Sequence, residues 1–147
     1  FEKWLLDMAS IGTLSDMVPL TGENRVLAHF GLKVLRKSPR VGLSRLLREL
    51  KCDQRFLTEE DVGFTIGPRI NAASRMGVPY DAFRLLSTTS EDEAYALATH
   101  LNKINDERKG IVAAITKEVR SIIRERYADS PKEVIVMGNP NWKPSIL

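Results

Sequence analysis

The longest regular apolar pattern in the chain lies between residues 91 and 127, and it limits the possible folds more than any other feature. Apolar side chains recur there at alternating steps of three and four, which places them on one face of an α-helix. Ser90 and Glu93 match a capping box, in which two side chains satisfy backbone N–H groups at a helix start. A helix over 91–127 would be about 55 Å long, at about 1.5 Å per residue. Since this exceeds the diameter of a small domain, we expect the helix to bridge two domains; a coiled-coil arm for a partner is the alternative.

The residues before this helix predict shorter helices separated by loops. Amphipathic spacing indicates helices over 1–11, 23–36, 43–51 and 81–86, with Gly12 stopping the first. Thr58 to Asp61 resembles a further helix start. Because Pro and Gly punctuate 13–22 and 67–79, we expect loops there, the second one ordered around a short helical turn.

After the long helix, residues 133–137 read as a buried strand. The fold expected is therefore mostly α-helical, followed by the first strand of a second α/β domain.

Composition excludes some classes of protein. No apolar run approaches the roughly 20 residues that cross a bilayer, and no secretory pattern is present. The single cysteine, Cys52, cannot form an internal disulfide, so we expect a cytoplasmic protein. The net charge is only +3, yet the cations between Lys33 and Lys51 are opposed by Glu49 alone. Such a cluster can follow a phosphate backbone, although a solvated helical face is the reading we favour on the sequence alone.

The first motif with chemical content surrounds Asp16. It reads Gly12-Thr13-Leu14-Ser15-Asp16-Met17-Val18-Pro19-Leu20. It resembles the fourth conserved motif of DHH-superfamily phosphoesterases in their RecJ form. The resemblance implies that Asp16 is a catalytic ligand of Mn²⁺ or Mg²⁺, hard cations that prefer carboxylate oxygen. On its own, Asp16 would read as a turn-forming residue. Asp7 is a weaker candidate, which we expect at the surface of the first helix.

The second motif is more specific. It reads Gly67-Pro68-Arg69-Ile70-Asn71-Ala72-Ala73-Ser74-Arg75-Met76-Gly77 and is similar to the Gly-Pro-Arg-x-Asn-Ala-Ala-Gly-Arg motif of the RecJ family, with Ser74 in place of Gly. The resemblance implies that Arg69, Asn71 and Arg75 bind the DNA substrate, since guanidinium groups match phosphate oxygens. We expect one of the two arginines to brace the loop instead, and the sequence leaves open which.

Two further matches follow in the family's order. The run Leu101-Asn102-Lys103-Ile104-Asn105-Asp106-Glu107-Arg108 resembles the helix that joins the two domains of RecJ-like proteins. The run Asn141-Trp142-Lys143-Pro144-Ser145 resembles Trp-His-Pro-Gly-Val, with Lys143 in place of His. A lysine there can still contact phosphate, and we expect Trp142 to be a packing residue.

The resemblance implies a three-part organisation. Residues 1–89 would be the C-terminal part of a DHH domain, 90–128 the interdomain helix, and 129–147 the start of a DHH-associated nucleic-acid-binding domain within an α/β parent protein. The Asp-His-His triplet and the downstream Gly-Gly-His motif are absent from this sequence. We therefore expect the chain to be an internal fragment, inactive alone.

The function implied for the full-length protein is metal-dependent, 5′-to-3′ hydrolysis of single-stranded DNA in recombination and repair. A single-strand-binding protein and a repair helicase are the protein partners it suggests; a membrane is not. Two alternatives stay open: a non-catalytic RecJ-like DNA-binding or replication scaffold, and a DHH-family phosphodiesterase of oligonucleotides or cyclic dinucleotides.

Overall fold

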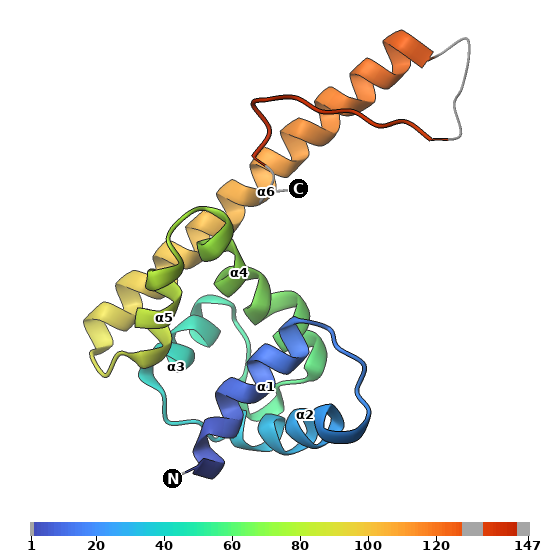
Figure 1. Cartoon of the computed structure of the whole chain (residues 1–147). Helices are drawn as coiled ribbons and strands as arrows, with labels where there is room; N and C mark the ends of the chain where they lie inside the picture. Colours follow the sequence, from blue (N-terminus) through green and yellow to red (C-terminus); the bar gives the residue numbers. More distant parts are fainter. Residues whose placement is uncertain (1, 128–133, 144–147) are drawn as a thin grey trace. The chain divides into compact units, whose positions relative to one another are not determined.

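A computed structural model describes residues 2–127 and 134–143, which are mostly helical (Figure 1). The elements, in order, are η1 (Glu2–Leu5), α1 (Leu6–Ser15), α2 (Gly22–Leu35), α3 (Val41–Glu49), η2 (Gln54–Phe56), η3 (Asp61–Ile66), α4 (Gly67–Arg75), α5 (Pro79–Ser87) and α6 (Glu91–Tyr127). The chain forms two compact units, Phe1–Asn105 and Asp106–Leu147, so the division falls within α6. The domain boundaries expected from the sequence stay predictions. None of the helices in the described residues is long and apolar enough to cross a membrane.

The core of the first unit forms where short helices approach each other closely. A Cβ at Gly31 of α2 would lie 2.3 Å from the Ser10 Cβ of α1. A Cβ at Gly42 of α3 would lie 1.6 Å from the Leu85 carbonyl oxygen of α5. The absence of a side chain at these two glycines therefore lets α1 meet α2 and α3 meet α5. The leucines and isoleucines that fill the space are fully buried, namely Leu35, Leu43, Leu46, Leu57, Ile66, Leu85 and Leu101.

Two of the expected boundaries are wrong. Helix α1 continues through Gly12 to Ser15, because burial of Ile11 and Leu14 outweighs the helical cost of a glycine, about 1 kcal/mol. The expected loop at 67–79 is replaced up to Arg75 by helix α4. Pro68 lies in the first turn of α4, where the φ that its ring imposes is already helical.

The helix that leads into α4 begins as the sequence predicted, but it is wound differently. The Asp61 carboxylate accepts hydrogen bonds from the Thr58 N–H and hydroxyl, both at 2.8 Å. From Asp61 to Ile66 the backbone is a π-helix, η3, which runs directly into α4. π-turns are rare in proteins overall, and those that occur are often found at functional sites.

Asp7 was expected at the surface, and this prediction is wrong. Its side chain is 1% exposed. One carboxylate oxygen accepts from the Ser38 hydroxyl at 2.6 Å and from Arg40 Nε at 2.8 Å. The other accepts from the Met8 N–H at 2.7 Å. Asp7 thus ties α1 to the turn before α3, a pairing more than thirty residues apart that helical periodicity does not reveal.

Helix α6 has the bounds that the sequence predicted, but only half of its capping box forms, because the Ser90 N–H donates to the Thr88 hydroxyl rather than to Glu93. The Ser90 hydroxyl accepts from the Glu93 N–H at 3.3 Å. The Glu93 carboxylate accepts from the Thr88 hydroxyl and pairs with Arg84. The Thr88 hydroxyl, followed by Arg84, holds the pKa of Glu93 below its usual value of 4.5.

This lowered pKa predicts a pH dependence of stability. A carboxyl group whose pKa is lower in the folded state stabilises the protein above its unfolded pKa and loses that contribution as the pH falls through the folded value. Wild type should therefore melt at a higher temperature than Glu93→Gln at pH 7, with the gap closing below about pH 4.5. Thermal unfolding followed by circular dichroism between pH 7 and 3 measures the gap. Asp92→Asn, an exposed neighbour in the same turn, is the control. A gap that is independent of pH would contradict the assignment.

The strand expected at 133–137 does not form within the described residues 134–137. Val134 and Val136 are 79% and 90% exposed. A strand is stabilised by hydrogen bonds to a neighbouring strand, and the described residues supply none. In this second unit, Glu118 of α6 instead accepts from the Asn139 amide and from the Trp142 indole N–H, each at 3.1 Å. The indole of Trp142 is thus tied to α6 by a hydrogen bond, and its role as a packing residue stays a prediction.

Candidate metal and nucleic-acid site

The loop that carries Asp16 leaves α1 in a strained turn. Asp16 ends the helix, and its N–H donates to the Gly12 carbonyl at 3.1 Å. The next residue, Met17, has a φ of +52°, a conformation that L-residues other than Asn and Asp rarely adopt. Both Asp16 and Met17 are exposed. The turn thus presents the Asp16 carboxylate to solvent directly after a rigid helix, and backbone strain of this kind is concentrated at functional sites.

The two main motifs of the sequence meet at Ser15 and Gly67. A Cβ at Gly67 would lie 2.6 Å from the Ser15 hydroxyl oxygen and 3.1 Å from the Ser15 Cβ. The residue before Asp16 therefore packs directly on the first residue of α4. This contact needs glycine at position 67 for space, and it fixes the Asp16 turn against the helix that carries Arg69, Asn71 and Arg75.

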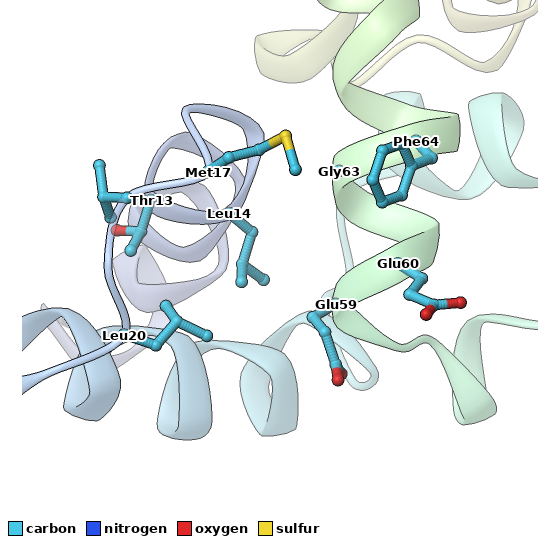
Figure 2. Close-up of a pocket in the computed structure, with 9 residues that line it drawn as sticks. Thr13, Leu14, Met17, Leu20, Glu59, Glu60, Gly63 and Phe64 are labelled. Carbon is cyan, nitrogen blue, oxygen red and sulfur yellow. The ribbon is translucent and has the colours of Figure 1, made fainter.

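A small apolar pocket borders the same turn (Figure 2). Leu14, Met17 and Leu20 line one side, and Gly63 and Phe64 of η3 face them (Figure 2). The rim carries the carboxylates of Glu59 and Glu60. The volume of about 190 Å³ is below the range of about 300–1,000 Å³ usual for small-molecule sites. The pocket lies between the turn and η3. At this volume it is too small to hold a nucleotide.

Arg69 braces α4 from within the first unit. Its Nε donates to the Asn102 side-chain oxygen of α6 at 3.3 Å, and one terminal nitrogen donates to the Thr65 carbonyl at 3.1 Å. The side chain is half-buried. Arg69 thus makes bracing contacts of the kind that the sequence predicted for one of the two arginines of the motif. Its partners Thr65 and Asn102 were not identified as site residues from the sequence.

Asn71 and Arg75 lie on the opposite face of α4. They are four residues apart and therefore share one helical face. Both are exposed, whereas Ala72 and Ala73 are fully buried. The small alanine side chains let α4 pack closely, and the polar face is presented to solvent.

The fit of a divalent metal to these residues is partial. Mn²⁺ and Mg²⁺ require about six ligands, mostly oxygens. No group of three or more His, Cys, Asp or Glu side chains that could hold a metal occurs among residues 2–127 and 134–143. Asp16 can supply one ligand, so the described residues alone do not form a metal centre. Cys52 offers no alternative chemistry as a nucleophile, since burial, followed by the nearby Asp61, raises the pKa of its thiol.

Lys143 belongs to the second unit. It is exposed and follows the turn at 139–142 that Glu118 holds. The structure thus brings Asp16, Arg69, Asn71 and Arg75 into one unit, and Lys143 lies in the other.

Solved structures of RecJ have the same fold as this chain. The chain superposes on RecJ from Thermus thermophilus in complex with Mn²⁺, with a TM-score of 0.80 and 34% identity, over 98% of this chain and 21% of that one. A complex with Mg²⁺ gives the same TM-score and identity. The fold is thus that of one region of a metal-binding exonuclease.

The curated relatives agree with the fold. The single-stranded-DNA-specific exonuclease RecJ of Bacillus subtilis is 36% identical over 97% of this chain. The RecJ proteins of Escherichia coli and Thermus thermophilus are 33% and 36% identical over 97% and 96% of it. No family model matches. By sequence and by fold, the chain belongs to the RecJ family. It spans 18% to 25% of the length of these relatives.

Proposed function

We propose that the full-length protein is a divalent-metal-dependent exonuclease that hydrolyses single-stranded DNA from the 5′ end and acts in recombination and repair in the cytoplasm. The observation that carries the proposal is the contact of Ser15 with Gly67, which holds the turn of Asp16 against α4, the helix that carries Arg69, Asn71 and Arg75. RecJ relatives named as single-stranded-DNA-specific exonucleases support the substrate class. A single-strand-binding protein and a repair helicase are the protein partners we infer.

In this proposal, Asp16 is one ligand of Mn²⁺ or Mg²⁺, and residues outside this chain supply the others. The crystal structures of RecJ with Mn²⁺ and with Mg²⁺ support this choice of metals. When bound, the metal would polarise the phosphate and lower the pKa of a water molecule.

In this proposal, the other residues of the chain bind the DNA backbone or position helix α4. Asn71 and Arg75 contact the DNA backbone from the exposed face of α4. Arg69 holds α4 in place through Thr65 and Asn102, so its effect on substrate binding is indirect. Lys143 offers a further phosphate contact from the second unit.

The test is degradation of 5′-labelled DNA by the full-length protein with Mn²⁺, comparing single strands, duplexes and dinucleotides. We expect release of the 5′ label from single strands as a mononucleotide, abolished by a chelator, and no activity from the 147-residue chain alone. A preference for dinucleotides would move the assignment to an oligonucleotide or cyclic-dinucleotide phosphodiesterase. Inactivity with any divalent metal would favour a non-catalytic scaffold.

The two arginines of α4 should differ when each is changed to Ala. Arg75→Ala should weaken binding of single-stranded DNA about tenfold and lower the melting temperature less than Arg69→Ala does, because the Arg75 side chain is exposed. Arg69→Ala should lower the free energy of unfolding by about 1–2 kcal/mol, since it removes two hydrogen bonds from a half-buried group. Fluorescence anisotropy in chelator and thermal unfolding separate the effects. The reverse pattern would exchange the two roles.

A further inference from the structure

The cationic cluster noted between Lys33 and Lys51 is divided by the fold. Arg36 donates twice to the Leu57 carbonyl, at 2.8 and 2.6 Å. Arg40 pairs with the buried Asp7, and Arg45 with Glu91 at 2.7 Å. These three arginines have structural roles, so the cluster does not form one continuous stripe of available charge.

Part of the cluster nevertheless gathers with a cation from another element. Lys33 near the end of α2, and Arg36 and Lys37 directly after it, line a groove of about 290 Å³ together with Arg55 of η2. All four lining residues are cationic. Asp53 opposes this charge: it pairs with Arg55 at 2.7 Å, and that arginine lowers the pKa of its carboxyl group to about 2. The carboxylate therefore stays ionised, and the groove keeps a clear excess of positive charge.

Two exposed aromatic rings flank this groove. The Lys33 ammonium lies 5.3 Å from the centre of the Phe30 ring, and the Arg55 guanidinium lies 5.5 Å from that of Phe56. The two rings are 50% and 72% exposed. Exposure of a large apolar ring to water is unfavourable, and stacking on a nucleobase would remove the ring from water. Cations between exposed rings are the combination that binds single-stranded nucleic acid without sequence preference.

We propose that Lys33, Lys37, Arg55, Phe30 and Phe56 form a second contact surface for single-stranded DNA, separate from the Asp16 site. The substrate class rests on the proposed function. The groove lies at the C-terminal end of α2, whereas Asp16 precedes the N-terminal end, and α2 has 14 residues, or about 21 Å of helix. The surface therefore holds a part of the strand that lies away from the reacting end. An acidic peptide is the competing occupant, but the two exposed rings beside the groove offer stacking surfaces that match nucleobases rather than carboxylate side chains.

The test is binding of a labelled oligothymidine of about 16 nucleotides to the full-length protein in chelator, measured by anisotropy over a range of salt concentrations. Lys33→Gln/Lys37→Gln should weaken binding and reduce the slope of log K against log salt by about 1.4, at about 0.7 per phosphate contact on a single strand. Phe56→Ala should weaken binding about tenfold with an unchanged slope, and Phe56→Trp should restore it. Since these side chains are exposed, all variants should keep the wild-type melting temperature.

The matched control is Arg25→Gln/Arg48→Gln, which removes two exposed cations outside the groove. An equal loss of affinity in the control would show general attraction and overturn the proposal, as would an unchanged slope in Lys33→Gln/Lys37→Gln. A glutamate-rich peptide that binds the groove more tightly than the oligonucleotide would assign it to a protein partner. Because chelator removes metal-dependent hydrolysis, these outcomes are independent of whether the exonuclease assignment holds.

Discussion

Replacing Asp16 with Ala in the full-length protein is expected to lower Mn²⁺-dependent hydrolysis of single-stranded DNA by at least about 100-fold. The exposed carboxylate follows α1 directly, and its loss would remove one of the charged oxygens that hold the metal. The fold should persist, because the bond that places Asp16 comes from its backbone N–H to Gly12, which alanine retains. Rates measured with single-stranded DNA over a range of Mn²⁺ concentrations would show whether added metal restores activity.

The conservative variants make this result specific. Asp16→Asn keeps the shape and removes the charge, so it should lose nearly as much activity. Asp16→Glu keeps the charge on a longer side chain and should require more Mn²⁺. Asp92→Ala removes an exposed carboxylate in the first turn of α6 and should leave the rate unchanged. Full activity in Asp16→Ala would exclude a role as metal ligand, whatever the other ligands are.

Asp7→Ala is expected to lower the free energy of unfolding by about 3 kcal/mol. Removing one partner of a buried ion pair leaves the other charge without compensation, which costs about 3–5 kcal/mol. Since the Arg40 side chain is 28% exposed, water screens part of that charge, and the lower end of the range applies. The Ser38 hydroxyl and the Met8 N–H lose their acceptor as well. Thermal and urea unfolding of the 147-residue chain would measure the change.

A double-mutant cycle with Arg40→Ala isolates the pair from the other contacts of Asp7. We expect the double variant to be more stable than the sum of the single losses predicts, because neither charge is then left alone. Asp7→Asn should be intermediate, since its amide oxygen still accepts a hydrogen bond. A loss below about 0.5 kcal/mol for Asp7→Ala would show that the network contributes little to stability.

The sequence predicted most of what depends on neighbouring residues. The bounds of α6 follow from its apolar spacing and from the capping residues Ser90 and Glu93, all local features. Helix α4 was missed because Gly67, Pro68 and Gly77 read as loop signals. In the fold, Gly67 gives Ser15 room and Pro68 starts a helix. The meaning of a glycine or proline therefore depended on contacts more than fifty residues away.

The same limit applies to the candidate site. Family resemblance selected Asp16, Asn71 and Arg75, which the structure leaves exposed. It did not separate Arg69 from Arg75, because the bond of Arg69 to Asn102 joins residues that are distant in sequence. Nor did it show that Asp7 is buried. The environment of Arg69 and of Asp7 is set by tertiary partners, Asn102 and Arg40, which are distant in the sequence.

The π-helix η3 sets the rotational phase of α4. A π-turn contains more residues than an α-turn. The segment between Thr58 and Gly67 can therefore hold an extra residue without rotating α4 about its axis, whereas in a regular helix an extra residue would rotate it. One residue fewer in this stretch would let it relax to a regular α-helix and leave α4 in the same phase, whereas one further residue would turn everything after it by about 100°. Gly67 would then no longer face Ser15, and the polar face of Asn71 and Arg75 would turn toward the core. This six-residue segment should thus tolerate deletion of one residue better than insertion of one.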